Sequence, residues 1–274
     1  MSGSIKRQGS GYVADCGYAA PRLDEPIVVI AYARSGIVWL RDLLESHQDV
    51  LWLGGFDAVQ LCDQLVQSWV TCEAAPNSQL SSLGKTSIRR FMYTMLTPRI
   101  AATGASHWCI ASTSRTPAVR SFMSIYPQAR FLCLHRNCFD MIFSGISACP
   151  WGLSGTGYGF ESFALAYPGN PVAALAEYWA SHTESMLAFE SEYQDRCRRV
   201  RYEDLAEDHR QIDTAIRGFL GLAEADVLAP KVASAAASEV EAAVGAGADV
   251  PLERIPSEVL ARVRTLLDEL GYSG

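Results

Sequence analysis

A chain of 274 residues that is 49% hydrophobic and 19% charged can bury a sizeable core and is too apolar to remain disordered. Its formal net charge of −7 offers no overall attraction to nucleic acid or to an anionic membrane, so we expect neither as a partner. An anionic small molecule is compatible with this charge if a few arginines and helix ends provide a local positive potential.

The first 24 residues are polar and rich in glycine and serine, and they lack the apolar segment of a secretion signal. Apolar runs elsewhere are too short to span a bilayer. The eight cysteines form no CxxC pair and no zinc-like spacing, which favours reduced thiols over disulfides or a metal site. We therefore expect a flexible arm over residues 1–24, a single domain over residues 25–274, and a cytoplasmic protein without a bound metal.

Short β-branched apolar runs alternate with segments of helical periodicity along the chain. Strands are predicted over residues 26–32, 50–53, 107–112, 129–135 and 198–202. Helices are predicted over residues 37–47, 57–70, 86–102, 117–126, 136–146, 172–192, 208–220 and 256–270. Residues 73–84, 148–172 and 223–250 lack this periodicity, and the second segment has the length of a functional or mobile loop. The alternation predicts a three-layer α/β fold, with a mostly parallel sheet flanked by helices.

The first strand leads into a helix through the sequence AYARSGIVWL. The free N–H groups and the dipole of a helix start favour an anion, and Gly36 allows close approach of the backbone. Arg34 can add a charge-assisted hydrogen bond. The GxxxxGK[ST] spacing of a nucleoside triphosphate loop is absent, which argues against a kinase of that type. An ordinary turn with an exposed arginine is the competing interpretation of this motif.

A second polar motif, HRNCFDMIFS, follows the strand predicted over residues 129–135. Arg136 comes directly after this strand, at the sheet edge where open α/β folds bind ligands. Ser144 lies two helical turns further on, so that both side chains could hold one phosphate. An intrahelical pair between Arg136 and Asp140 is the alternative. A third motif, RYEDL, contains Tyr202 and two acidic residues that are typical of a helix start.

In this order, the motifs resemble those of the sulfotransferase superfamily. Its members have PRSGTTWL or PKSGTTW where this chain has ARSGIVWL, and LLxxHPDV where it has LLESHQDV. They have FPDARFxxLxRDPxDxxxS where this chain has YPQARFLCLHRNCFDMIFS, and their xRYEDL and FLGL recur here as VRYEDL and GFLGL. The resemblance covers most of residues 26–222. The C-terminal RKGxxG block of the cytosolic subfamily is absent, which places the chain nearer the bacterial branch and suggests a role in secondary metabolism.

The resemblance implies a P-loop-like fold that binds 3′-phosphoadenosine-5′-phosphosulfate (PAPS) as co-substrate and releases 3′-phosphoadenosine-5′-phosphate (PAP). It assigns the 5′-phosphosulfate to the first turn, comprising Arg34, Ser35, Gly36, Ile37, Val38 and Trp39. It assigns the 3′-phosphate to Arg136 and Ser144, and a position near the adenine to Tyr202. The expected reaction transfers a sulfuryl group to a hydroxyl or amine of a small-molecule acceptor, without a metal. The sequence leaves a monomer and a homodimer open.

Several residues depart from the family pattern. Ile37 and Val38 replace two threonines that supply hydroxyls to the phosphosulfate. A lysine or histidine of the family is missing near residues 111–113, and Arg115 or Lys85 could replace its charge. A degenerate PAP- or PAPS-binding protein without sulfuryl transfer is therefore the alternative function.

The catalytic groups are less clearly marked than the donor site. Arg34 is expected to stabilise the charge on the leaving phosphate, with Arg115 beside it. Asp57 is the first candidate for the general base, with a helix N-cap as its competing role, and His47 is the second candidate. His107 and His182 are expected to be structural or exposed rather than functional. Aromatic side chains that either shape an acceptor pocket or fill the core are Trp151, Tyr158, Phe160 and Phe163.

Overall fold

The computed structural model describes residues 22–55, 57–72, 78–113, 116–148, 159–223 and 250–272. The described part begins against the body of the protein, because the N–H of Arg22 donates to the carbonyl of Ser106 and Leu23 is buried. Within these ranges, no helix is both long and apolar enough to cross a membrane. The cysteines with described side chains, which are Cys62, Cys109, Cys133, Cys138 and Cys197, are free thiols.

Five parallel strands form the central sheet, in the order β2-β3-β1-β4-β5. The strands are β1 (Ile27–Ile30), β2 (Val50–Trp52), β3 (His107–Ser112), β4 (Arg130–His135) and β5 (Cys197–Arg201). In β1, Ile30 is in register with Ser112 of β3 and with Cys133 of β4. The carboxyl ends of these three strands therefore lie side by side, and the segments that follow them start from one edge of the sheet.

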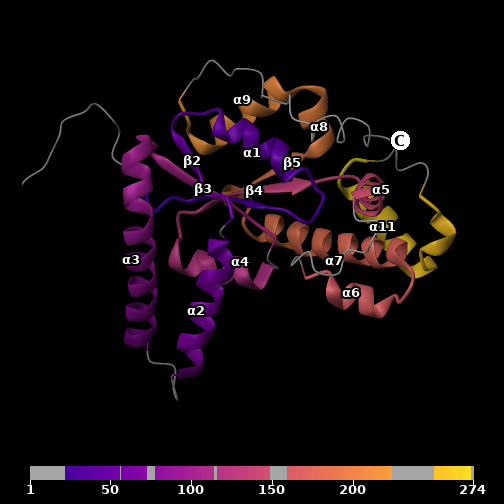
Figure 1. The fold of residues 1–274 in the computed structure, drawn as a ribbon, viewed down its shortest axis with the longest axis horizontal. Coiled ribbons are helices and arrows are strands. Elements are labelled where there is room, and N and C mark those ends of the chain that lie inside the picture. The colour runs from indigo at the N-terminus through magenta and orange to yellow at the C-terminus, as the bar shows by residue number, and fades with distance from the viewer. Residues whose placement is uncertain are drawn as a thin grey trace, which may run out of the picture.

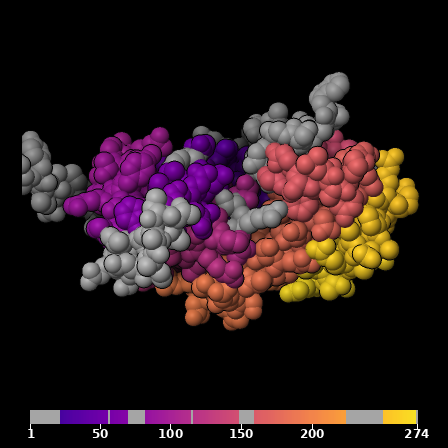
Figure 2. All heavy atoms as spheres, turned by 90° about the horizontal axis from the view of Figure 1, so that it is seen from below, coloured from indigo at the N-terminus to yellow at the C-terminus, as the bar shows by residue number. Residues whose placement is uncertain are grey.

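Helices cover both faces of the sheet, as Figure 1 shows. On one face lie α1 (Ile37–Glu45), α8 (Tyr202–Glu207) and α9 (His209–Leu220). On the other face lie α2 (Ala58–Cys72), α4 (Thr116–Ile125) and α7 (Pro171–Glu192), with α3 (Ser78–Thr103) against α2. Three more helices pack on α7: α5 (Cys138–Ala148), α6 (Glu161–Ala166) and α11 (Ser257–Glu269). Figure 2 shows α2 and α3 at one end of the molecule and α6, α7 and α11 at the other. This confirms the predicted three-layer α/β fold.

Alternate residues of β1 point into two separate cores, because side chains on a strand alternate between its faces. Ile27 and Val29 pack with α1 and α9, whereas Val28 and Ile30 pack with the helices of the opposite face. The helix after β1 thus lies on one face of the sheet, and the helices after the neighbouring strands β3 and β4 lie on the other. In α/β proteins, such a divergence marks the edge of the sheet at which ligands bind.

Helix α8 is absent from the prediction, and the other predicted elements differ from the structure most clearly in three regions. Helix α3 begins at Ser78, eight residues before the predicted start, so the predicted loop over residues 73–84 is wrong for its last seven residues. Gly84 lies inside this helix, where an added Cβ would be only 2.8 Å from the indole of Trp69 in α2. Glycine at this position therefore leaves room for the Trp69 side chain. The short helix α6 occupies part of the segment predicted as a loop over residues 148–172. Helix α5 begins at Cys138, after Arg136 and Asn137 rather than with them.

Candidate functional site

The turn between β1 and α1 holds two residues in left-handed backbone conformations. Arg34 has φ 66°, which a residue with a side chain adopts at a cost of about 1–2 kcal/mol. Gly36, the N-cap of α1, has φ 98°, and an added Cβ would lie 2.2 Å from Cδ2 of Tyr202. Glycine is thus required at position 36 for both its conformation and its size. The turn is a specific structure and not a generic connection.

The start of α1 presents backbone donors at this turn. The N–H groups of Trp39 and Leu40 donate to the carbonyl of Gly36, at 3.0 and 3.4 Å, so the first bonds of the helix begin at Trp39. The N–H groups of Ile37 and Val38 precede these bonds, and no carbonyl within the helix is in position to accept from them. The Val38 side chain is 45% exposed and adds no hydroxyl to these donors. An anion at this end would be bound through the backbone and the helix dipole.

Arg136 joins this turn from the end of β4, which finishes at His135. Its Nη1 donates to the carbonyl of Arg34 at 2.8 Å, and its guanidinium lies 4.3 Å from the centroid of the Tyr202 ring. Nε of Arg34 in turn donates to Oγ of Ser144 at 3.0 Å. The structure therefore brings Arg34, Arg136, Ser144 and Tyr202 together. Arg136 lies two residues before α5, which begins at Cys138.

Several buried donors around the turn have no acceptor. Nε and Nη2 of Arg136, Nε1 of Trp39 and Oγ of Ser35 are buried without a hydrogen-bond partner in the described part of the chain. Trp39 also lies against the Tyr202 ring, with centroids 5.8 Å apart. An unpaired buried polar group costs about 1–3 kcal/mol, and more when it is charged. Such a concentration of unpaired donors is expected where a polyanionic ligand supplies the acceptors.

A family profile decides between the classes of anion-binding protein that this geometry allows. The profile of the sulfotransferase family matches residues 26–226, which is well over half of the chain. The chain belongs to the sulfotransferase family. This confirms the resemblance drawn from the motifs, and the turn, Arg136 and Tyr202 all lie within the matched region of this sulfotransferase.

Solved structures agree on the fold. A sulfotransferase domain from the curacin biosynthetic pathway is 14% identical, with a TM-score of 0.59, over 91% of this chain and 98% of that one. The sulfotransferase domain of the Synechococcus PCC 7002 olefin synthase is 17% identical, with a TM-score of 0.56, over 94% and 99% of the two chains. A sulfotransferase from Alicyclobacillus acidocaldarius is 15% identical, with a TM-score of 0.51, over 89% and 96%. No curated protein sequence matches the chain.

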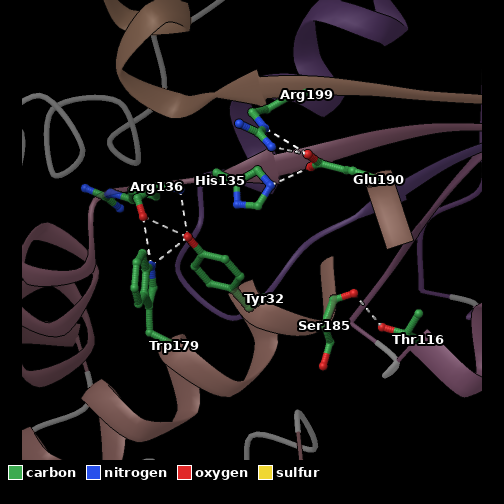
Figure 3. Close-up of polar contacts among 8 residues, drawn as sticks. All are labelled: Tyr32, Thr116, His135, Arg136, Trp179, Ser185, Glu190 and Arg199. Atoms are coloured by element: carbon green, nitrogen blue, oxygen red, sulfur yellow. Dashed lines mark hydrogen bonds and ion pairs between the residues drawn. The ribbon is translucent and has the colours of Figure 1, made fainter. Parts of the chain in front are cut away.

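Buried aromatic side chains support the backbone at Arg136 and at the turn (Figure 3). The Tyr32 hydroxyl donates to the carbonyl of Arg136 at 2.8 Å and accepts from its N–H at 2.7 Å. The indole N–H of Trp179 lies 2.9 Å from both the Tyr32 hydroxyl and the same carbonyl. The neighbouring Tyr178 hydroxyl accepts from the N–H of Ala33 at 3.0 Å. Helix α7 thus holds the backbone of both segments that carry the site arginines.

Sequence reasoning missed this network. The sequence places Tyr32 at the end of a predicted apolar strand, and Tyr178 and Trp179 within the helix predicted over residues 172–192. Their Tyr hydroxyls and Trp N–H groups were a usable signal, because a buried Tyr or Trp usually has a hydrogen-bond partner. The partners are backbone groups far away in the sequence, which no local pattern identifies.

His135, at the end of β4, belongs to a second buried cluster in the same view (Figure 3). Its Nε2 lies 2.7 Å from Oε1 of Glu190, and Nε of Arg199 donates to Oε2 of Glu190 at 2.8 Å. Burial opposes ionisation of Glu190, but the hydrogen bonds from His135 and Arg199 outweigh it and lower the pKa of this carboxyl. The cluster therefore ties α7 to β4 and β5 through an ionised carboxylate, next to Arg136.

Asp57 lies between β2 and α2, at the same edge of the sheet as the turn. Its Oδ1 accepts from the N–H of Gln60 at 3.0 Å, which is the predicted N-cap contact. Its Oδ2 accepts from the hydroxyl of Ser112 at 3.0 Å, and the carbonyl of Ser112 accepts from the N–H of Ala31. Ser112 therefore connects Asp57 to the chain just before the turn between β1 and α1.

The structure does not bring His47 to this site. His47 follows the far end of α1, is 2% exposed, and its Nε2 lies 2.7 Å from Oδ1 of Asp213. Arg217 donates to the other oxygen of the same carboxylate at 2.7 Å. His107 lies at the start of β3, where burial lowers its pKa, and its Nδ1 lies 2.8 Å from Oγ of Ser106. These two histidines lie towards the amino ends of the strands, away from the turn.

The remaining predicted residues fall into two groups. Phe160 and Phe163 are buried with their rings edge-on to Tyr178, and His182 stacks on the same tyrosine with centroids 4.2 Å apart. This packing corresponds to the core-filling alternative for the two phenylalanines. Lys85 lies in α3, which packs on α2 and α4 rather than on the turn. The predicted residues Arg115, Trp151 and Tyr158 lie outside the described residues.

Among the described residues, no group of three or more His, Cys, Asp or Glu could hold a metal ion.

Proposed function

We propose that the chain transfers a sulfuryl group from PAPS to a hydroxyl or amine of a small-molecule acceptor. The observation that carries this proposal is the set of buried donors around the turn, on Ser35, Trp39 and Arg136, for which the described residues provide no acceptor. PAPS has anionic groups at both its 5′ and 3′ positions, so it can supply acceptors to two clusters of donors at once. Membership of the sulfotransferase family supports the same reaction class.

The two clusters divide the donor between them in this proposal. The turn and the start of α1 bind the 5′-phosphosulfate, through the N–H groups of Ile37 and Val38 and the side chain of Arg34. Arg136 and Ser144 bind the 3′-phosphate. The hydrogen bond between Arg34 and Ser144 supports this division, since it places the two clusters in contact. The Tyr202 ring, stacked under Arg136 and against Gly36, is then next to the nucleoside.

The reaction itself is an in-line displacement at sulfur. The acceptor oxygen or nitrogen forms the new bond to sulfur while the bond from sulfur to the 5′-phosphate oxygen breaks, and PAP leaves with that electron pair. Arg34 and the N–H groups of the helix start stabilise the charge that develops on the leaving oxygen. The protein mainly positions the reactants and holds charge, as in phosphoryl transfer.

Asp57 is the group that accepts the acceptor's proton in this proposal. Its half-buried carboxylate and its link through Ser112 to the start of the turn support this role. The carboxylate also caps α2, so it has a structural function at the same time. The hydrogen bonds from Gln60 and Ser112 hold the carboxylate in one orientation.

A degenerate binding protein is the second candidate, and one observation favours it. Val38 is 45% exposed at the helix start and offers a methyl group where a hydroxyl would bind the phosphosulfate. A hydrogen bond to a charged group contributes about 1.5–3 kcal/mol, so its loss would slow transfer if the hydroxyl acted in the transition state. Such a protein would bind PAP but would not turn over.

Two measurements test these alternatives. Thermal unfolding with PAP, ATP and 5′-AMP at equal concentrations tests the donor site, because only PAP has a 3′-phosphate. PAP at about 100 times its Kd should add about 2.7 kcal/mol to the free energy of unfolding, and ATP much less. Equal stabilisation by the three nucleotides would contradict the proposed donor. Mass spectrometry of candidate acceptors incubated with PAPS then distinguishes transfer from binding alone.

A further inference from the structure

The C-terminal end of the described chain lies against the segment that carries Arg136. The hydroxyl of Tyr272 donates to Oε2 of Glu203 at 2.7 Å. The other oxygen of Glu203 accepts from the N–H of Asn137, the residue after Arg136, at 2.8 Å. One carboxylate thus links the end of the chain to the backbone next to the buried arginine.

Two further contacts hold Tyr272 in place. The guanidinium of Arg201 lies 4.4 Å from the centroid of the Tyr272 ring, and its Nη1 donates to the carbonyl of Gly271 at 3.3 Å. Gly271 has φ 76° and turns the chain after α11, so that the N–H of Tyr272 bonds back to the carbonyl of Leu267 at 2.9 Å. Arg201 therefore holds the ring, and the bond to Leu267 holds the backbone of Tyr272. Together they fix the direction in which the Tyr272 hydroxyl points.

The backbone around Arg136 depends on three supports. Its N–H and carbonyl contact Tyr32, and the carbonyl also accepts from Trp179. The next N–H, of Asn137, has Glu203 as its acceptor. The first two supports come from neutral groups in the core. The third is a carboxylate, whose position depends on the Tyr272 hydroxyl.

We propose that Tyr272 is a positioning residue that holds Glu203, and through Asn137 the Arg136 segment, in the geometry that favours a nucleotide with a 3′-phosphate. This inference rests on the proposed function, because it assigns the 3′-phosphate to Arg136. Burial and the neighbouring Glu203 carboxylate raise the pKa of Tyr272 far above its ordinary value. The hydroxyl therefore stays protonated at neutral pH and can donate to Glu203.

The test compares the affinities of PAP and 5′-AMP by calorimetry in the wild type and in Tyr272→Phe. The substitution removes one hydroxyl and keeps the ring under Arg201. We expect the preference for PAP over 5′-AMP to fall about 10-fold, which is the loss of one hydrogen bond to a charged group, with the affinity for 5′-AMP unchanged. Glu203→Gln, which weakens both bonds of the same side chain, should shift the ratio in the same direction.

Arg262→Gln is the matched control in α11. Arg262 donates to Glu177 at 2.8 Å and to Glu184 at 2.8 Å, so its loss loosens α11 from α7 without touching Glu203. It should lower the Tm and leave the PAP preference intact. If Arg262→Gln lowers the preference as much as Tyr272→Phe, general loosening explains the effect and the inference is wrong.

The outcomes separate this inference from the proposed function. A wild-type protein that binds PAP and 5′-AMP equally would contradict the donor assignment. A wild-type protein that prefers PAP, together with a Tyr272→Phe variant that keeps the full preference, would overturn the inference alone. A lower Tm in Tyr272→Phe with an unchanged ratio would also overturn it, because that result describes a purely structural contact.

Discussion

Arg136 and Tyr202, which are 66 positions apart in the sequence, stack at the centre of the candidate site, with the guanidinium carbon 4.3 Å from the ring centroid. The same ring leaves no space for a side chain at Gly36. A single tyrosine therefore sets both the shape of the first turn and the position of the buried arginine. The contact connects the turn at Gly36 with Arg136. A substitution at either residue should therefore change the position of the other through Tyr202.

Gly36→Ala should damage both the fold and the donor site. The new methyl group would meet Tyr202 at 2.2 Å in a left-handed backbone conformation. We expect a loss of about 2–4 kcal/mol in the free energy of unfolding, the sum of backbone strain and overpacking, together with weaker PAP binding. Gly55→Ala is the control, because Gly55 has φ 71° and nothing within 4 Å of an added Cβ. It should cost only the strain, about 1–2 kcal/mol, and leave PAP affinity unchanged. Equal effects of the two variants on PAP affinity would contradict the importance of the Tyr202 contact.

Arg136→Ala should weaken PAP binding strongly. Arg136 is 2% exposed and two of its guanidinium nitrogens have no acceptor in the described part of the chain, so a bound phosphate would be their partner. Removing one partner of a buried charge pair costs about 3–5 kcal/mol, which corresponds to more than a hundredfold in Kd. Calorimetry with PAP measures the change, and Arg99→Ala on the exposed side of α3 is the control. Normal PAP affinity in Arg136→Ala would refute the 3′-phosphate role.

Asp57→Asn separates the proposed base from the helix cap. The amide oxygen can still accept from the N–H of Gln60, so the Tm should change little. If Asp57 accepts the acceptor's proton, kcat should fall by about 10²–10⁴-fold. Asp57→Ala removes the cap as well and should lower stability by about 1 kcal/mol. Near-normal turnover in Asp57→Asn would show that Asp57 only caps α2. Catalysis would then be better explained by an acceptor that needs no base.

Acid should destabilise the protein through Glu190. This carboxyl has a folded pKa below its ordinary value of 4.5, so its contribution to stability is fully present above that pH. The contribution is lost as the pH falls through the lower folded pKa, because protonation breaks the bonds from His135 and Arg199. Glu190→Gln should make stability less dependent on pH below about 4.5. Urea unfolding from pH 3 to 7 measures this, with the exposed Glu161→Gln as control. If the free energies of unfolding of the wild type and Glu190→Gln fall in parallel below pH 4.5, another group causes the loss of stability in acid.

Local patterns were enough to predict most of the fold. Strand β3 has the predicted bounds, and β4 begins one residue after its predicted start, because a β-branched or apolar run between turn residues has few alternatives to a buried strand. The turn before α1 and the position of Arg136 after β4 follow from the same alternation. The motifs also indicated the family, which the profile over residues 26–226 confirms. All of these features depend on residues close together in the sequence.

Tertiary structure alone decided which side chains meet. The sequence ranked Asp57 before His47 as a candidate base, but it did not say how far either residue lies from the turn. The fold does separate them: α1 carries His47 to the far edge of the sheet, where Asp213 pairs with it, whereas β2 carries Asp57 back to the edge of the turn. The supports from Tyr32, Trp179 and Tyr272 were equally invisible in the sequence. Hydrogen bonds to a distant backbone depend on how strands and helices pack, and a local pattern of residue types contains no record of that packing.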